Sequence, residues 1–171
     1  WQRLDLWLAD EPSGFDYDAQ LDLIRQVAEA LAYAHGKNVV HRGLGPRAIK
    51  VTTENNGRRR VTIGDWQGVG RTDEATATSA TRGVTTLMDA DRHPSAAQER
   101  WVEEGFAAPE GVLVGAPDRL RLDVFGLGAL AFYIVTGGQA PARTRADLTA
   151  RLNAQGGLDV SVELPTVAPA L

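Results

Sequence analysis

The stretch from Leu120 to Thr136 limits the fold more than any other part of the sequence, because it is apolar on nearly every side of a helix. Its uncharged part, Val124 to Val135, has 12 residues, fewer than the roughly 18–20 needed to cross a bilayer. We therefore predict a helix over 120–136 that is buried on every side in a globular domain. Asp123 in this helix must be paired or hydrogen-bonded if it is buried. The alternative is an exposed first-turn residue that the helix dipole favours.

The rest of the sequence predicts a mixed helical and β-structure. Apolar residues at three- and four-residue intervals predict a helix over 18–35, and a second amphipathic helix follows over 145–153. Short β-prone runs surround a hairpin signal in which Asn and Gly tolerate positive φ. The expected segments are a linker and short element at 1–8, strands at 39–40, 49–52 and 60–63, a hairpin turn at 55–57, a mobile loop at 71–86 and a short helix at 96–102.

Composition excludes several classes of function. The 171 residues suit one domain. Their 18 Lys and Arg against 22 Asp and Glu give a net charge of −4, which disfavours nucleic acid and anionic membranes as partners. The absence of Cys excludes disulfides, thiolate zinc sites and cysteine nucleophiles. Without a visible signal peptide or membrane span, we expect a cytoplasmic protein.

Three short motifs stand in a fixed order: His41-Arg42-Gly43-Leu44-Gly45-Pro46-Arg47-Ala48, then Gly64-Asp65-Trp66-Gln67-Gly68, then Ala108-Pro109-Glu110. This order resembles the C-terminal lobe of protein kinases, in which H-R-D-x-x-x-x-N, D-F-G and A-P-E follow one another. Asp123-Val124-Phe125-Gly126-Leu127-Gly128 is similar to the D-x-x-S-L-G stretch of the same family. The resemblance covers residues 5–165.

The resemblance implies an α+β fold, a kinase-like C-lobe that is mainly helical with a small β-hairpin region. One domain over 1–171 would have a hinge-like start at 1–10, an activation-like segment at 65–110 and a buried central helix at 120–136. The glycine-rich loop, strand Lys and helix Glu of the family belong to an N-lobe that these residues do not contain.

Carried over residue by residue, the catalytic loop is degenerate. His41 and Arg42 match the family, but Gly43 stands at the position of the base Asp. Gly45 occupies the position of a Lys that neutralises the transferred phosphoryl group, and Ala48 that of the Asn that helps to hold magnesium. A kinase needs these side chains to orient the hydroxyl, accept its proton and stabilise the phosphoryl charge.

Other positions keep the family pattern. The resemblance implies that Asp65 is a former or weak ligand for ATP-bound Mg²⁺, although Trp66 and Gln67 replace the Phe and Gly of the family, and a simple turn Asp is the alternative. It also implies that Asp123 accepts backbone hydrogen bonds near His41 and Arg42, and that His41 is largely structural. Pro109 and Glu110 would be structural, with Glu110 paired to an Arg beyond Leu171, and His35 would cap or pack the end of its helix.

Three hypotheses follow. The first is a pseudokinase that binds or regulates a protein partner or other domains of its parent chain. The second is a divergent active serine/threonine kinase that uses ATP and Mg²⁺. The third is an unrelated helical domain, in which Asp123 would be exposed and Asp65 far from His41. The motifs also resemble kinase-like regions of bacterial phage-defence proteins of the BREX type.

Overall fold

The computed structural model describes residues 1–10, 16–66, 70–71, 104–112 and 119–160. The predicted helix over 96–102 and nearly all of the predicted loop over 71–86 lie outside these ranges. Within them, no helix combines the length and the apolar character that crossing a membrane requires.

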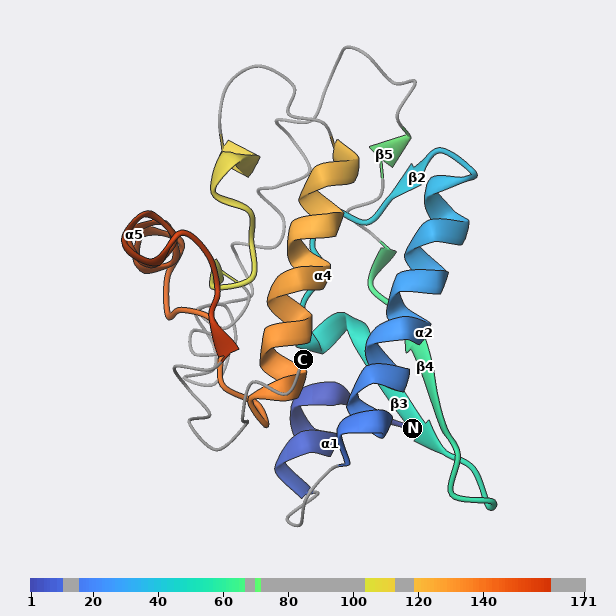
Figure 1. The fold of residues 1–171 in the computed structure, drawn as a ribbon. Helices are drawn as coiled ribbons and strands as arrows, with labels where there is room; N and C mark the ends of the chain where they lie inside the picture. Colours follow the sequence, from blue (N-terminus) through green and yellow to red (C-terminus); the bar gives the residue numbers. More distant parts are fainter. Residues whose placement is uncertain (11–15, 67–69, 72–103, 113–118, 161–171) are drawn as a thin grey trace, which may run out of the picture.

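Two long helices form the centre of the fold. α2 (Tyr17–His35) and α4 (Arg119–Val135) lie side by side and run in opposite directions, so the end of α2 meets the start of α4 (Figure 1). Leu23, Val27 and Leu31, spaced four residues apart, are buried along one face of α2. The amphipathic helix predicted from this spacing is confirmed, and it begins one residue earlier than expected.

Two small antiparallel sheets flank the helices. β1 (Gln2–Arg3), β3 (Ile49–Thr53) and β4 (Arg59–Ile63) form one sheet in the order β1-β3-β4. β2 (Val39–Val40) pairs with β5 (Gly70–Arg71) in the other. The loop predicted over 71–86 is therefore wrong at Arg71, which belongs to β5.

The turn between β3 and β4 follows the sequence prediction. Gly57 has φ of 80°, a left-handed conformation that favours glycine. The backbone N–H of Glu54 donates to the carbonyl of Arg58 at 2.8 Å and closes the turn. The predicted hairpin is confirmed.

A side chain from α2 fastens this hairpin to the helix. The amide oxygen of Gln26 accepts from the N–H of Val61 at 2.9 Å, and its amide nitrogen donates to the carbonyl of Arg59 at 3.0 Å. β4 is the edge of its sheet, so these backbone groups have no strand partner. Gln26 thus supplies partners for the backbone groups at the open edge of β4. The helical pattern of the sequence does not indicate this role.

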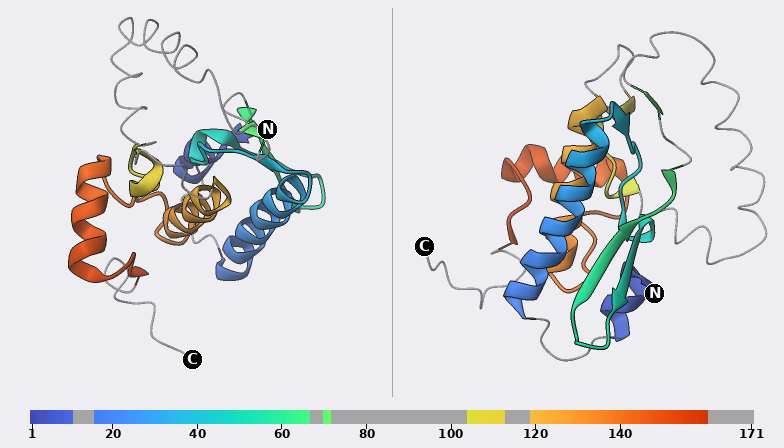
Figure 2. Two further views of the ribbon diagram at one scale, coloured as in Figure 1. Left: turned by 90° about the horizontal axis from the view of Figure 1, so that it is seen from above. Right: turned by 90° about the vertical axis from the view of Figure 1, so that its right-hand side faces the viewer.

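A short helix lies near each end of the described chain. α1 (Leu4–Asp10) buries Leu4 and Trp7 against the sheet, where the sequence predicts a linker and a short element. α5 (Arg145–Gln155) lies on the opposite side of α4 from α2 (Figure 2). The helix predicted over 145–153 is confirmed, and Gly156 ends it with φ of 71°.

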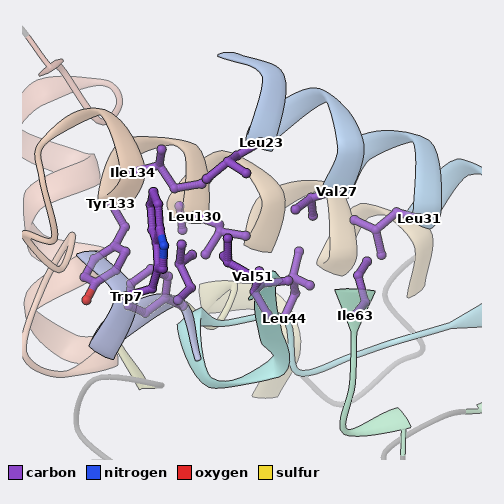
Figure 3. Close-up of a cluster of buried hydrophobic side chains, with 14 residues drawn as sticks. Trp7, Leu23, Val27, Leu31, Leu44, Val51, Ile63, Leu130, Tyr133 and Ile134 are labelled. Carbon is purple, nitrogen blue, oxygen red and sulfur yellow. The ribbon is translucent and has the colours of Figure 1, made fainter. Parts of the chain in front are cut away.

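The hydrophobic core fills the space between α2, α4, α1 and the three-stranded sheet (Figure 3). Leu130 and Ile134 project from α4 toward this core and are fully buried. Its labelled members in Figure 3 are Trp7, Leu23, Val27, Leu31, Leu44, Val51, Ile63, Leu130, Tyr133 and Ile134.

The expectation that the central helix is buried on every side is wrong. Val124 is 60% exposed, and Arg121 and Gly128 are exposed on the same face at helical spacing. The elements of the described chain cover only the other faces of α4. An apolar sequence therefore predicted the helix correctly and its burial only in part.

Two glycines in α4 offer a matched test of this packing. A Cβ on Gly126 would lie 3.1 Å from the Cβ of Leu44, whereas a Cβ on Gly128 would meet nothing within 4 Å. We expect Gly128→Ala to stabilise the protein by about 1 kcal/mol through helix propensity. Gly126→Ala should destabilise it because Leu44 must move. Urea unfolding of both variants measures the difference, and equal stabilisation would contradict the close approach.

Tyr133 predicts a loss of stability at alkaline pH. Burial raises the pKa of its phenol, and the nearby Asp5 carboxylate adds to the effect. The folded state therefore favours the neutral phenol, and stability falls as pH rises from about 10, the unfolded pKa, through the raised folded pKa. Tyr133→Phe should lose less stability than the parent as the pH rises from about 8 to the raised pKa of the folded state. Equal alkaline losses in urea unfolding would refute this assignment.

Candidate functional site

The carboxylate of Asp123 lies at the centre of the site. Its Oδ1 accepts from the backbone N–H of Arg42 at 2.7 Å, and its Oδ2 accepts from that of His41 at 2.7 Å. Asp123 is only 1% exposed, so these charge-assisted bonds replace the water that burial removed. The resemblance implies both bonds, and the structure contains them. The alternative of an exposed first-turn Asp is wrong.

His35 adds a third contact to the same carboxylate. Its Nε2 lies 2.9 Å from Oδ2 of Asp123, where the last turn of α2 meets the first turns of α4. A carboxylate oxygen only accepts, so Nε2 of His35 is the donor. The expectation that His35 caps or packs the helix end missed this partner, because nothing in the sequence relates two residues 88 positions apart.

His41 connects the loop after β2 to the turn after β4. Its Nε2 lies 2.9 Å from the carbonyl oxygen of Gly64, and its Nδ1 accepts from the N–H of Gly43 at 3.3 Å. A carbonyl only accepts, so the ring carries its proton on Nε2. The ring also meets the edge of Trp66, with centroids 4.8 Å apart. His41 is 1% exposed and holds two loops together.

Two residues in these loops have left-handed backbone conformations that non-glycine residues rarely adopt. Arg42 has φ of 68° and Asp65 has φ of 53°. Such conformations cost about 1–3 kcal/mol and persist where the surroundings impose them. Arg42 follows His41 and donates to Asp123, and Asp65 follows the carbonyl that His41 binds. The hydrogen-bond network therefore holds both turns in shape.

The degenerate positions lie in the same loop. Gly43 is exposed, and a Cβ added there would meet nothing within 4 Å. Gly45 is buried and extended, with φ of −158°. Ala48 ends the 3-10 helix η1 (Pro46–Ala48), is 3% exposed, and accepts from the N–H of Gly64 at 2.6 Å. The loop thus keeps its backbone contacts without the side chains that kinases use.

The side chains of this cluster keep only part of the set that holds a magnesium nucleotide in the family. Among Gly43, Gly45, Ala48 and Asp65, the exposed carboxylate of Asp65 is the only side-chain oxygen. Magnesium prefers six oxygen ligands, and Ala48 offers none where the family has an amide. Nowhere in the described ranges do three His, Cys, Asp or Glu side chains come together as a metal site.

Pro109 and Glu110 begin the 3-10 helix η4 (Pro109–Val112), and both are partly buried. The structure brings η4 against α5. The expected partner of Glu110 beyond Leu171 stays a prediction.

The structure brings most of the sequence-predicted residues together. Asp123, His41 and Arg42 are in direct contact, and Asp65 lies between two residues that His41 touches. The hypothesis of an unrelated helical domain required an exposed Asp123 and a distant Asp65, so it is wrong. Sequence reasoning missed the contact of His35 with Asp123.

The comparisons with known proteins agree with this geometry. The family described as protein tyrosine and serine/threonine kinase matches residues 2–161. The chain therefore belongs to the protein kinase family, and the predicted α+β kinase-like fold is confirmed.

Individual relatives are kinases of bacteria and eukaryotes. "Probable kinase PglW" of Streptomyces coelicolor is 31% identical over 172 residues, covering 92% of this chain and 10% of the relative. Serine/threonine-protein kinase PknF of Mycobacterium tuberculosis is 30% identical over 126 residues, covering 74% and 23%. Serine/threonine-protein kinase/endoribonuclease ire-1 of Caenorhabditis elegans is 28% identical over 121 residues, covering 70% and 11%.

The chain thus spans between 10% and 23% of the length of these relatives. The activities in their names belong to much longer proteins. None of these names bears on the resemblance to phage-defence proteins, which stays a prediction.

The Asp123 network predicts a large effect of a small substitution. Asp123→Asn keeps the shape but replaces one accepting oxygen with a donating amide, which then faces a backbone N–H or His35. We expect a loss of about 1–3 kcal/mol in the free energy of unfolding, since a buried donor is left unsatisfied.

Glu29→Gln is the control, because Glu29 is exposed and forms an i,i+4 pair with Arg25, worth about 0.3–0.5 kcal/mol. Urea unfolding measures both variants. Equal, small losses would show that the Asp123 bonds do not support the fold.

Proposed function

We propose that this chain is a pseudokinase-type module with a binding or regulatory role and with weak or absent nucleotide binding. Its partner would be another protein or other domains of its parent chain. The observation that carries the proposal is the contrast within one loop: the contacts that shape it are intact, while the side chains that transfer phosphate are missing.

The empty position at Gly43 supports this contrast. Gly43 does not have a positive φ in the structure, and its surroundings leave room for a side chain. Packing therefore does not require glycine there. The loop could hold an Asp at position 43 without strain. The fold therefore does not explain why the carboxylate is missing.

The strained backbone supports a retained scaffold. Arg42 and Asp65 keep left-handed conformations at a cost of about 1–3 kcal/mol each. The contacts to Asp123 and Gly64 that impose these conformations give the two loops a defined surface. A binding module needs such a surface, whereas efficient phosphoryl transfer also uses the base, the cation and the metal ligand.

The alternative is a divergent active serine/threonine kinase. It is favoured by the exposed Asp65 carboxylate on its retained turn and by relatives named as serine/threonine-protein kinases. Phosphoryl transfer depends mainly on positioning and electrostatic stabilisation, so weak activity does not strictly require the base. A carboxylate from elsewhere in the parent protein would have to replace Gly43.

Thermal unfolding with and without ATP and Mg²⁺ distinguishes these functions. A ligand present at 100 times its dissociation constant adds about 2.7 kcal/mol and moves the midpoint by several degrees. We expect millimolar ATP and Mg²⁺ to move the midpoint of the full natural chain by less than about 1 °C.

Asp65→Asn is the control for this experiment, because it removes the carboxylate that the resemblance assigns to the metal. A shift of several degrees that Asp65→Asn abolishes would favour the divergent kinase and overturn the proposal.

A further inference from the structure

The hairpin of β3 and β4 concentrates positive charge in a chain that is otherwise acidic. Residues 47–63 contain five Lys or Arg and one Glu, a net charge of +4. The whole chain carries −4, which leaves −8 for the other residues. Arg58, Arg59 and Arg60 are the only adjacent Lys or Arg residues in the sequence. The charge of the protein is therefore distributed very unevenly.

Strand alternation places these side chains on two faces of the sheet. The residues on both sides of Lys50 are buried, so Lys50 lies on the outer face. Arg60 is opposite Thr52, two residues further along β3, and therefore lies on the same face. The side chain of Arg60 is 67% exposed. Arg59 lies on the inner face, where its guanidinium carbon is 5.4 Å from the centroid of the Trp7 ring.

Ion pairs within the chain compensate only part of this charge. Glu54, at the start of the turn, pairs with Arg60 at 2.9 Å. The ion pairs between described residues include neither Arg58, which is exposed in the turn, nor Lys50, whose Nζ lies 4.6 Å from the centroid of the Trp1 ring. We call Lys50, Arg58 and Arg60 the basic hairpin surface.

The fold holds this surface on a rigid support. Gln26 fastens β4 to α2 through two hydrogen bonds to its backbone. The ladder pairs every residue of β3 with one of β4. Association is weakened by the loss of conformational freedom, and a preorganised surface loses less of it. The hairpin therefore presents its cations in a form suited to binding.

We propose that the basic hairpin surface docks a segment of a partner protein that is rich in Asp and Glu. The planar N–H donors of Arg58 and Arg60 match the oxygens of carboxylates, and Lys50 adds a third positive charge. The inference goes beyond the proposed function, because docking at the hairpin requires neither nucleotide nor the loop at Gly43.

The acidic remainder of the chain favours a short peptide segment over a larger polyanion. Charges in water interact over about 8–10 Å at physiological salt. A nucleic acid or an anionic bilayer extends much further than this, so the acidic parts of the chain would repel it. A short acidic segment contacts the hairpin alone and avoids this repulsion.

Fluorescence anisotropy of the full natural chain, without ATP, tests the proposal with labelled peptides. The probes are a short peptide of alternating Glu and Ser and its counterparts with Gln or Lys in place of Glu. We expect only the Glu peptide to bind, and to bind less tightly as salt screens the charges. Equal binding of the Gln peptide would overturn the proposal. Tighter binding of single-stranded RNA or of phosphatidylserine vesicles would overturn it as well.

Two matched variants locate the binding. Arg58→Glu should weaken binding of the Glu peptide at least about fivefold, because it replaces an attraction with a repulsion. Arg143→Glu makes the same change of charge at an exposed residue before α5, on the far side of α4 from α2 (Figure 2). It should leave binding nearly unchanged. Equal losses in both variants would show an effect of net charge alone and would contradict the proposal.

Glu54→Gln separates recognition from support of the fold. It removes the acid that pairs with Arg60, so it should tighten binding of the Glu peptide, whereas a merely structural role of this pair would weaken it. Weaker binding of the peptide would overturn the proposal. Urea unfolding checks that Arg58→Glu and Glu54→Gln remain folded. If no acidic peptide binds and no phosphate is transferred, the docking inference fails and the pseudokinase proposal stands.

Discussion

The buried carboxylate of Asp123 is the interaction on which the rest of the site depends. It receives two backbone N–H groups from one loop and the imidazole of His35 from the end of α2. It thereby joins α4, α2 and the loop that begins at His41. His41 then extends the same network to the turn at Gly64. One buried carboxyl group thus helps to fix two turns whose backbones are strained at Arg42 and Asp65.

Much of this arrangement could be predicted from the sequence, because it depends on local pattern or on ordered motifs. Helical spacing located α2 and α5, an apolar run located α4, and a turn signal located the hairpin. What escaped prediction depends on contacts between distant residues: Gln26 fastening the edge of β4 and His35 binding Asp123. The exposure of Val124 escaped for a related reason, since apolar composition does not reveal which faces of a helix neighbouring elements cover.

This kinase-family chain keeps the contacts that shape the loop and lacks three of the side chains that the family uses there. The parts that give the loop its shape use backbone groups, Asp123 and His41, and all of them are in place. The parts that would act on a phosphate are side chains, and Gly43, Gly45 and Ala48 supply none. A loop that is held firmly but lacks these side chains is suited to binding.

The most direct test of this account is a phosphoryl-transfer assay on the full natural chain, using ATP labelled at its γ-phosphate, Mg²⁺ and protein substrates with free Ser and Thr. The account predicts no incorporation above that of the Asp65→Asn variant. Incorporation that exceeds this background and disappears in the variant would contradict it, because the side chains described here would then suffice for catalysis.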